Sequence, residues 1–117
     1  MKSKRGLSLS LSLFMALTTF VGTASAAAPK AAPAGDVAAG KVLFTGKLGC
    51  YGCHGQAGGG GMGPSLADKT WIYGGDAETI SETIHNGRPG GMPAFGSNAS
   101  EEEIADVVAY VMSLSAK

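Results

Sequence analysis

The chain has 117 residues, enough for one small domain, with nine basic and nine acidic side chains. Equal numbers of basic and acidic side chains leave no excess of positive charge, and nucleic-acid binding requires such an excess, so we do not expect a nucleic-acid partner. The 19 glycines raise the entropic cost of folding, and the only two cysteines lie three residues apart, which excludes a disulfide framework of long loops. We therefore expect a cofactor to complete the core of so small a domain.

The first 26 residues have the features of a secretory signal peptide. Three basic side chains precede an apolar stretch, Leu7–Val21, and residues 24–26 (Ala-Ser-Ala) form a pattern that signal peptidases accept. An uncleaved membrane anchor is the alternative, but this stretch of about 15 residues is shorter than the ~20 needed to cross a bilayer. We predict cleavage after Ala26, a periplasmic location and no stable membrane insertion. Residues 27–35 would then be a flexible lead and residues 36–117 the folded domain.

The folded domain is expected to contain short helices joined by glycine-rich loops. Asp36 is a candidate N-cap for a first helix that runs to about Lys47. The segment Gly55–Pro64 is too rich in glycine for any regular element, so it should be a loop. A second helix is predicted to begin after Asp76 and to stop at Asn86-Gly87, a favourable pair for a helix C-terminus.

The last helix is the most clearly marked. The segment 88–98 before it contains two prolines and is predicted to be a loop. Ser100–Glu103 then matches a capping box, with acidic side chains at the positive end of the helix dipole. No strand is evident, so we predict an all-α fold of three or more short helices, whose loops wrap a large flat ligand. The apolar residues that follow the capping box at helical spacing are Ile104, Val107, Val108, Val111 and Leu114.

Residues 50–54, Cys-Tyr-Gly-Cys-His, form the C-x-x-C-H pattern of covalent haem attachment. Two thiols three residues apart can each form a thioether with one of the two vinyl groups of a porphyrin. The imidazole of His54 then lies beneath the ring, where one of its nitrogens can bind iron. The sequence thus predicts one covalent haem c, with Cys50 and Cys53 as its attachment points and His54 as an iron ligand.

Three other kinds of site could use the same two cysteines. A thioredoxin-like redox pair would begin a helix after a strand, and no strand is evident. A zinc site would need a fourth ligand, for which only His85 remains, at an unusual spacing. A disulfide between Cys50 and Cys53 would close too short a loop to stabilise the domain much. All three are less favoured than haem attachment.

The sixth position on the iron decides what a haem protein does. A second strong protein ligand gives an electron carrier, whereas an open position invites small ligands. The candidates are Met62, Met92, Met112 and His85. Met62 follows His54 too closely, Met112 in the last helix is expected to be core, and His85 is expected to face solvent near a helix end. Met92 lies in Gly-Gly-Met-Pro, a loop able to fold over the opposite face, so it is the preferred ligand.

With the haem motif, Gly63-Pro64-Ser65-Leu66 and Gly91-Met92-Pro93 in place, the chain resembles a class I (mitochondrial cytochrome c-like) c-type cytochrome domain. The resemblance covers nearly all of the chain after the predicted signal peptide. It implies a small cytochrome c fold in which the first and last helices cross at close range. Gly40 would let the two helix backbones approach, and Phe44 would pack against Tyr110.

The same resemblance implies roles for individual residues. Cys50 and Cys53 would form the thioethers, with His54 and Met92 as axial ligands. The carbonyl of Pro64 would accept a hydrogen bond from the far nitrogen of His54, which would fix the ring and raise its donor strength. Candidates for hydrogen bonds to the haem propionates are Trp71, Tyr73 and Arg88.

A closer likeness lies in residues 68–75 (Asp-Lys-Thr-Trp-Ile-Tyr-Gly-Gly), in Thr83-Ile84 and in Gly87-Arg88. These segments resemble a haem domain of the dihaem subunit of cbb3-type cytochrome oxidases. That subunit has two haem motifs and a membrane anchor, whereas this chain has one motif and no predicted anchor. The resemblance therefore points to a soluble, free-standing relative.

The expected function is one-electron transfer between redox proteins, not catalysis. The chain would be a soluble, monomeric periplasmic carrier, with a donor dehydrogenase or reductase and an acceptor oxidase or reductase as partners. After signal cleavage, six basic and nine acidic side chains give a net charge of −3, which would suit a partner with a positive patch. Two alternatives remain: a haem subunit of a periplasmic oxidoreductase complex, and a five-coordinate haem protein that binds small ligands.

Overall fold

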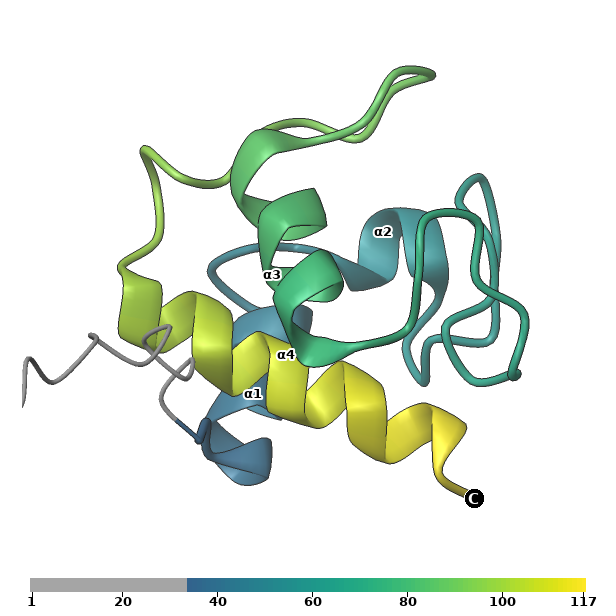
Figure 1. Cartoon of the computed structure of the whole chain (residues 1–117), viewed down its shortest axis with the longest axis horizontal. Helices are drawn as coiled ribbons and strands as arrows, with labels where there is room; N and C mark the ends of the chain where they lie inside the picture. Colours follow the sequence, from purple (N-terminus) through teal and green to yellow (C-terminus); the bar gives the residue numbers. More distant parts are fainter. Residues whose placement is uncertain (1–33) are drawn as a thin grey trace, which may run out of the picture.

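The computed structural model describes residues 34–117, so the predicted signal peptide and most of the predicted lead lie outside the described residues. The described part is helical and contains no strand, which confirms the predicted all-α fold. Figure 1 shows the long last helix crossing the first, with the third helix above them. The helices are α1 (Val37–Thr45), α2 (Tyr51–His54), α3 (Ala77–Asn86) and α4 (Glu101–Ser115).

Helix α1 begins where the sequence predicts. The side chain of Asp36 accepts a hydrogen bond from the amide of Ala39 at 2.8 Å and so caps the helix. The helix ends at Thr45, two residues before the predicted end at Lys47. The amide of Leu48 instead turns back to the carbonyl of Leu43 at 3.0 Å, and this turn places the Leu48 side chain in the core.

The packed part of the chain starts at Gly35, the last residue of the predicted lead. A Cβ atom at Gly35 would overlap the backbone of Ala105 in α4. The next amide, that of Asp36, donates to the carboxylate of Asp106 at 2.7 Å. Both contacts tie the start of the domain to its last helix.

The crossing of α1 and α4 depends on one glycine and one aromatic pair. A Cβ atom at Gly40 would overlap the carbonyl oxygen of Asp106, so only glycine allows this approach of the two backbones. One turn later, the rings of Phe44 and Tyr110 meet edge to face, with centroids 5.2 Å apart and planes at 67°. Phe44 is fully buried. The crossing that the resemblance implied is therefore confirmed.

We expect Gly40→Ala to destabilise the protein by about 1–3 kcal/mol, because the added methyl group forces α1 and α4 apart. The matched control is Gly59→Ala, at an exposed loop position where an added Cβ meets no atom within 4 Å. Denaturant unfolding of the haem-loaded protein measures both effects. Equal stability of the two variants would contradict the close crossing.

Helices α3 and α4 both begin at side-chain caps. Asp76 accepts a hydrogen bond from the amide of Thr79 at 2.8 Å, and α3 ends at Asn86, as predicted. At α4, Ser100 Oγ accepts from the Glu103 amide at 3.1 Å and Glu103 Oε2 accepts from the Ser100 amide at 3.0 Å. The predicted capping box is therefore confirmed.

The apolar face of α4 forms most of the core, but the expectation for Met112 is wrong. Its side chain is 38% exposed, because it follows Val111 by one residue and so points about 100° away from that residue. The buried apolar residues of the helix are Ile104, Ala105, Val107, Val108, Tyr110, Val111 and Leu114. Among the described residues, no helix is long and apolar enough to cross a membrane.

The contacts of the Glu103 carboxylate make the stability of the fold depend on pH in the acid range. Hydrogen bonds from Lys47 Nζ, at 2.7 and 2.8 Å, and from the Ser100 amide hold the pKa of Glu103 below its usual value. Because the pKa of Glu103 is lower in the folded than in the unfolded protein, its carboxylate stabilises the fold at pH values above the ordinary glutamate pKa of about 4.3. This stabilisation is lost as the pH falls through the lower pKa of the folded state.

We therefore expect the free energy of unfolding to fall less steeply with acidification in Glu103→Gln than in the native protein. Glu102→Gln, in the same helical turn and exposed, is the control and should keep the native slope. Denaturant titrations at a series of pH values between about 6 and 3 measure the slopes. Identical slopes for the native protein and Glu103→Gln would contradict this role of Glu103.

Candidate haem-binding site

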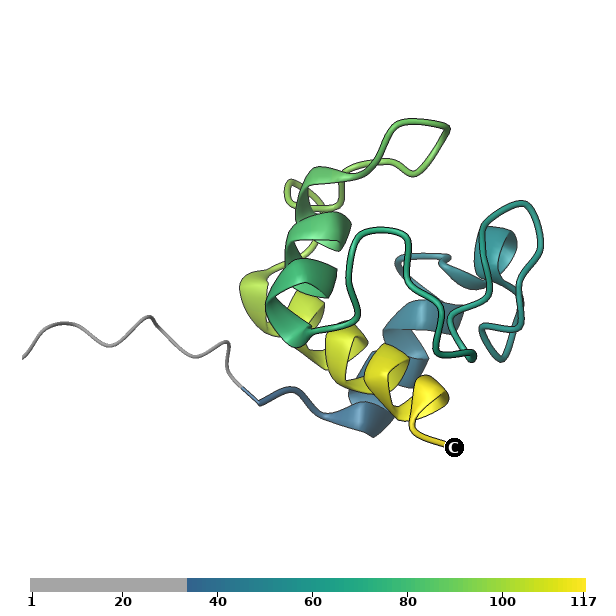
Figure 2. The same ribbon diagram turned by 45° about the vertical axis from the view of Figure 1, so that its right-hand side comes forward.

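A large cavity of about 610 Å³ lies among α2, α3, α4 and the loops that join them. Figure 2 shows α2 and the loops around it on one side of this region and α3 with its following loop on the other. The volume lies within the range of cavities that hold cofactors. Its walls are mainly apolar. The buried side chains that line it include Phe44, Leu48, Ile80, Ile84, Val107 and Val111.

The haem motif forms a helix of its own, which the sequence did not predict. After Gly49, at φ 62°, the chain turns into α2, and the amides of Cys53 and His54 both donate to the carbonyl of Cys50, at 3.2 and 3.0 Å. One helical turn therefore places both thiols and the imidazole at the cavity wall. The two cysteines form no disulfide and are partly buried, and burial raises the pKa of the Cys50 thiol.

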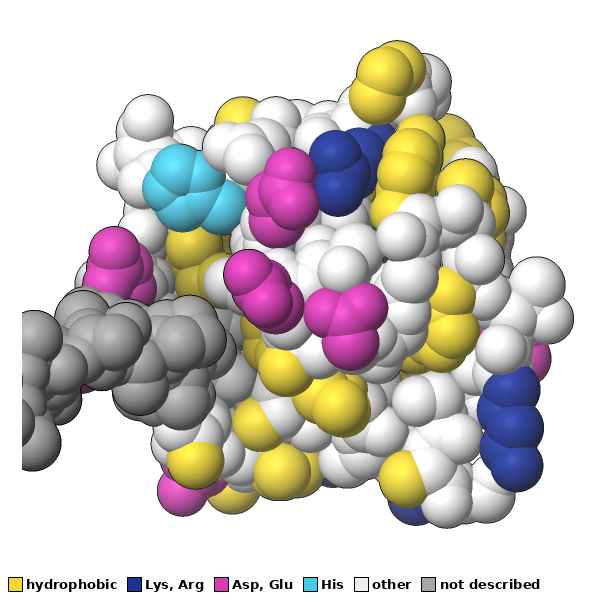
Figure 3. All heavy atoms as spheres, viewed as in Figure 1, with side chains coloured by type: hydrophobic (Ala, Val, Ile, Leu, Met, Phe, Trp, Pro, Cys, Tyr) yellow, Lys and Arg dark blue, Asp and Glu magenta, His cyan; other side chains and the backbone are white. Residues whose placement is uncertain are grey.

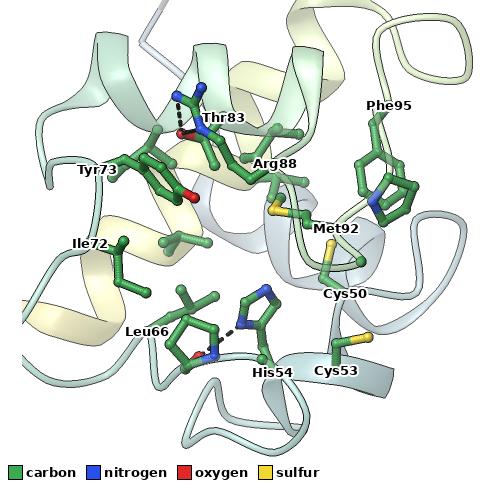
Figure 4. A pocket seen from close by; sticks show the side chains of 18 of the residues that line it. Cys50, Cys53, His54, Leu66, Ile72, Tyr73, Thr83, Arg88, Met92 and Phe95 are labelled. Carbon is green, nitrogen blue, oxygen red and sulfur yellow. Dashed lines mark hydrogen bonds between the residues drawn. The ribbon is translucent and has the colours of Figure 1, made fainter.

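The His54 ring is held by the segment that follows it. Its Nδ1 lies 2.8 Å from the carbonyl oxygen of Pro64, the contact that the resemblance implied. Because a carbonyl oxygen can only accept, Nδ1 is the donor in this contact, and in the neutral ring Nε2 is then the nitrogen with a lone pair for a metal. Figure 4 shows this second nitrogen directed into the cavity. The ring also packs closely on Gly63, where a Cβ atom would lie 2.8 Å from Cε1.

The thioether of Met92 enters the cavity from the side opposite His54 (Figure 4). The loop that carries it folds back on α3: the amide of Arg88 donates to the Met92 carbonyl at 3.0 Å, and the amide of Phe95 donates to the Ile84 carbonyl, also at 3.0 Å. The fold back begins at Gly87, with φ 70°, where a Cβ atom would lie 2.6 Å from the Met92 carbonyl oxygen. The position of Met92 is thus set by α3.

The three rival ligands have exposed side chains. Met62 is at the cavity mouth with 88% of its side chain exposed, and Met112 faces outward from α4. His85 is exposed and does not line the cavity; its Nδ1 lies 2.9 Å from the side-chain oxygen of Asn86. His85 is therefore a surface residue near a helix end, as expected.

The three propionate candidates all line the cavity. Trp71 is partly buried against Gly75, and the Tyr73 hydroxyl points into the cavity, although 51% of the side chain is exposed. The guanidinium of Arg88 lies 4.5 Å above the centre of the Tyr73 ring. Two of its N–H groups donate to Thr83 Oγ1, from Nε at 3.1 Å and from Nη2 at 2.8 Å. Thr83 belongs to the segments that carry the resemblance, but the sequence did not predict its contact with Arg88, because no local pattern links a helix threonine to an arginine in the next loop.

The donor set of this cavity fits a haem c. Two thiols one helical turn apart suit two vinyl groups, and an imidazole nitrogen with a free lone pair faces a soft thioether across an apolar space. Within residues 34–117, no group of three His, Cys, Asp or Glu side chains could hold a metal ion.

Comparisons with known proteins agree with this fit. Residues 35–111 match the family described as cytochrome c oxidase, cbb3-type, subunit III. The cbb3-type cytochrome c oxidase subunit CcoP of an Azospirillum species is 41% identical over 93 residues, which are 73% of this chain and 31% of that subunit. This chain thus spans about a third of that curated relative.

Solved structures give the same fold. Cytochrome cL of Methylophaga aminisulfidivorans superposes with a TM-score of 0.62 at 33% identity, covering 68% of this chain and 53% of that one. Cytochrome c6 of the diatom Phaeodactylum tricornutum gives a TM-score of 0.57 at 35% identity, covering 68% and 93%. With the spacing of Cys50 and Cys53, these matches identify the cofactor as covalent haem c. The chain belongs to the family of cytochrome c electron-transfer domains represented by subunit III of the cbb3-type cytochrome c oxidases.

Proposed function

We propose that this protein is a soluble periplasmic electron carrier, with His54 and Met92 as the axial ligands of a haem attached to Cys50 and Cys53. One observation carries the proposal: the free nitrogen of His54 and the sulfur of Met92 enter the cavity from opposite sides. A haem iron between them would have two protein ligands and no open position, which favours electron transfer over small-ligand chemistry.

The haem, when bound, supplies an iron that accepts and gives up one electron. The chain's own residues keep the surroundings of that iron constant. The hydrogen bond between His54 Nδ1 and the Pro64 carbonyl holds the imidazole in one orientation and strengthens it as a donor. The backbone bonds between α3 and the Met92 loop hold the thioether, and a thioether ligand raises the potential. Apolar walls exclude water, so little has to reorganise when an electron moves.

Exposed side chains at the cavity mouth support contact with redox partner proteins. Met62, Ile72 and Tyr73 are 88%, 71% and 51% exposed, and all three line the cavity. Exposed apolar side chains at the mouth of a cavity are typical of a contact surface. Figure 3 shows acidic side chains over α3 beside hydrophobic ones, so charge would help to guide a partner. Such docking should be transient and weaker at high salt.

A tightly held subunit of an oxidoreductase complex is the second candidate. The relatives favour it, because CcoP is named as a subunit of an oxidase and this chain matches only about a third of it. The carrier is preferred because the sequence predicts a signal peptide for export and contains a single haem motif.

Gentle periplasmic extraction followed by size-exclusion chromatography separates the two candidates. We expect the haem absorbance to elute at the mass of a lone monomer and to be absent from washed membranes. Elution with other polypeptides in constant ratio would favour the complex, and haem absorbance retained on membranes would contradict a soluble carrier.

A further inference from the structure

Arg88 joins three segments at the rim of the cavity. Its Nε and Nη2 both donate to Thr83 Oγ1 on α3, its guanidinium covers the ring of Tyr73 from the preceding loop, and its amide donates to the carbonyl of Met92 (Figure 4). The guanidinium is planar, so two bonds along one edge to one oxygen fix its orientation. Thr83 therefore determines where this cation lies.

The cation in turn restrains Tyr73. This side chain is half exposed and precedes Gly74-Gly75, of which Gly74 has φ 133°, so its own loop offers little restraint. A guanidinium 4.5 Å from the ring centre is within the range of cation–π attraction. With the ring held in this way, the Tyr73 hydroxyl points into the cavity (Figure 4).

We propose that Thr83 is a positioning residue which, through Arg88, holds the Tyr73 hydroxyl as a hydrogen-bond donor to a haem carboxylate. The inference deepens the proposed function and rests on it. The hydroxyl faces a mainly apolar cavity, and the carboxylates of the propionates are the hydrogen-bond acceptors that a haem brings to such a place. Arg88 then acts by holding Tyr73 and not by binding the carboxylate itself.

A donor at the carboxylate has a measurable effect on the potential. It draws off part of the negative charge near the iron, and this favours the reduced state, which carries one positive charge fewer. Loss of the donor, or loss of the restraint on it, should therefore lower the reduction potential. A direct charge effect of Arg88 would have the same sign, so single variants cannot separate the two roles.

A double-mutant cycle does separate them. Redox titrations of the haem-loaded protein would compare Tyr73→Phe, Thr83→Val and the double variant with the native chain. We expect each single variant to lower the ratio of reduced to oxidised protein at a fixed potential by roughly two- to tenfold. The double variant should equal Tyr73→Phe alone, and Thr83→Ser, which keeps the hydroxyl, should keep the native ratio. Thr45→Val, at the exposed end of α1, is the matched control.

Two outcomes would overturn the proposal. An unchanged potential in Tyr73→Phe would show that the hydroxyl contacts no haem carboxylate. An equal shift from Thr83→Val with and without Tyr73 would show that Arg88 acts directly. If Thr83→Val does not accumulate, Arg88→Lys takes its place, because lysine keeps a cation but cannot bond Thr83 along a planar edge. Absorption bands recorded for every variant report the axial ligands, so failure of the proposed carrier function would be seen separately.

Discussion

Replacement of Met92 by alanine is expected to lower the reduction potential and to let carbon monoxide bind the reduced protein. The thioether lies across the cavity from His54, so its removal opens the sixth position on the iron. Axial ligands set haem potentials over a span of about 0.8 V, and loss of a thioether should cost on the order of 0.1 V of that span. Redox titration measures the potential, and the absorption spectrum under the gas measures the open position.

Met62→Ala is the matched control for this experiment. Met62 also lines the cavity, but it is 88% exposed at the mouth, so its loss should leave the potential and the response to carbon monoxide nearly unchanged. An unchanged potential in Met92→Ala would refute Met92 as the ligand. A large shift in Met62→Ala instead would move the assignment to Met62.

Replacement of Cys50 by alanine is expected to leave little mature protein. One of two covalent attachments is lost, and the apolar walls of a cavity of about 610 Å³ then depend on a loosely held cofactor to fill them. A domain this small has a limited hydrophobic core, so weaker attachment of the cofactor removes a large part of its stability. The measurements are haem absorbance per mole of protein and the yield of purified protein, and both should fall severalfold.

Gly52→Ala tests whether any change within the motif has the same effect. An added Cβ at Gly52 meets no atom within 4 Å and keeps both thiols, so haem content should stay near the native value. Normal maturation and stability of Cys50→Ala would contradict the view that the attached cofactor completes the core.

The helices could be predicted because their signals are local. Asp36, Asp76 and Ser100 each cap a helix within three residues of sequence, and such contacts do not depend on the rest of the fold. The end of α1 and the exposure of Met112 were mispredicted, because both depend on what packs alongside. Helix α2 was missed because a four-residue helix between glycines has no periodicity to detect.

The candidate haem site, like the helices, could be predicted where its contacts are local in the sequence. The attachment motif lies within five residues of sequence, and the contact between His54 and Pro64 spans only ten more. The preference for Met92 over Met62 and Met112 was already a prediction from the sequence, and the fold adds its physical reason: the loop returns onto α3 and directs the Met92 sulfur toward the side opposite the imidazole. The bond between Thr83 and Arg88 joins a helix to a loop through side chains alone, and no pattern of residue types announces it.

The absorption spectrum of the haem-loaded protein, reduced and then exposed to carbon monoxide, tests the central claim most directly. Two protein ligands on the iron predict sharp c-type bands that the gas does not change. A spectrum that shifts under carbon monoxide without denaturation would show an open or easily displaced sixth position. That result would contradict the His54 and Met92 assignment and would favour small-ligand binding over electron transfer.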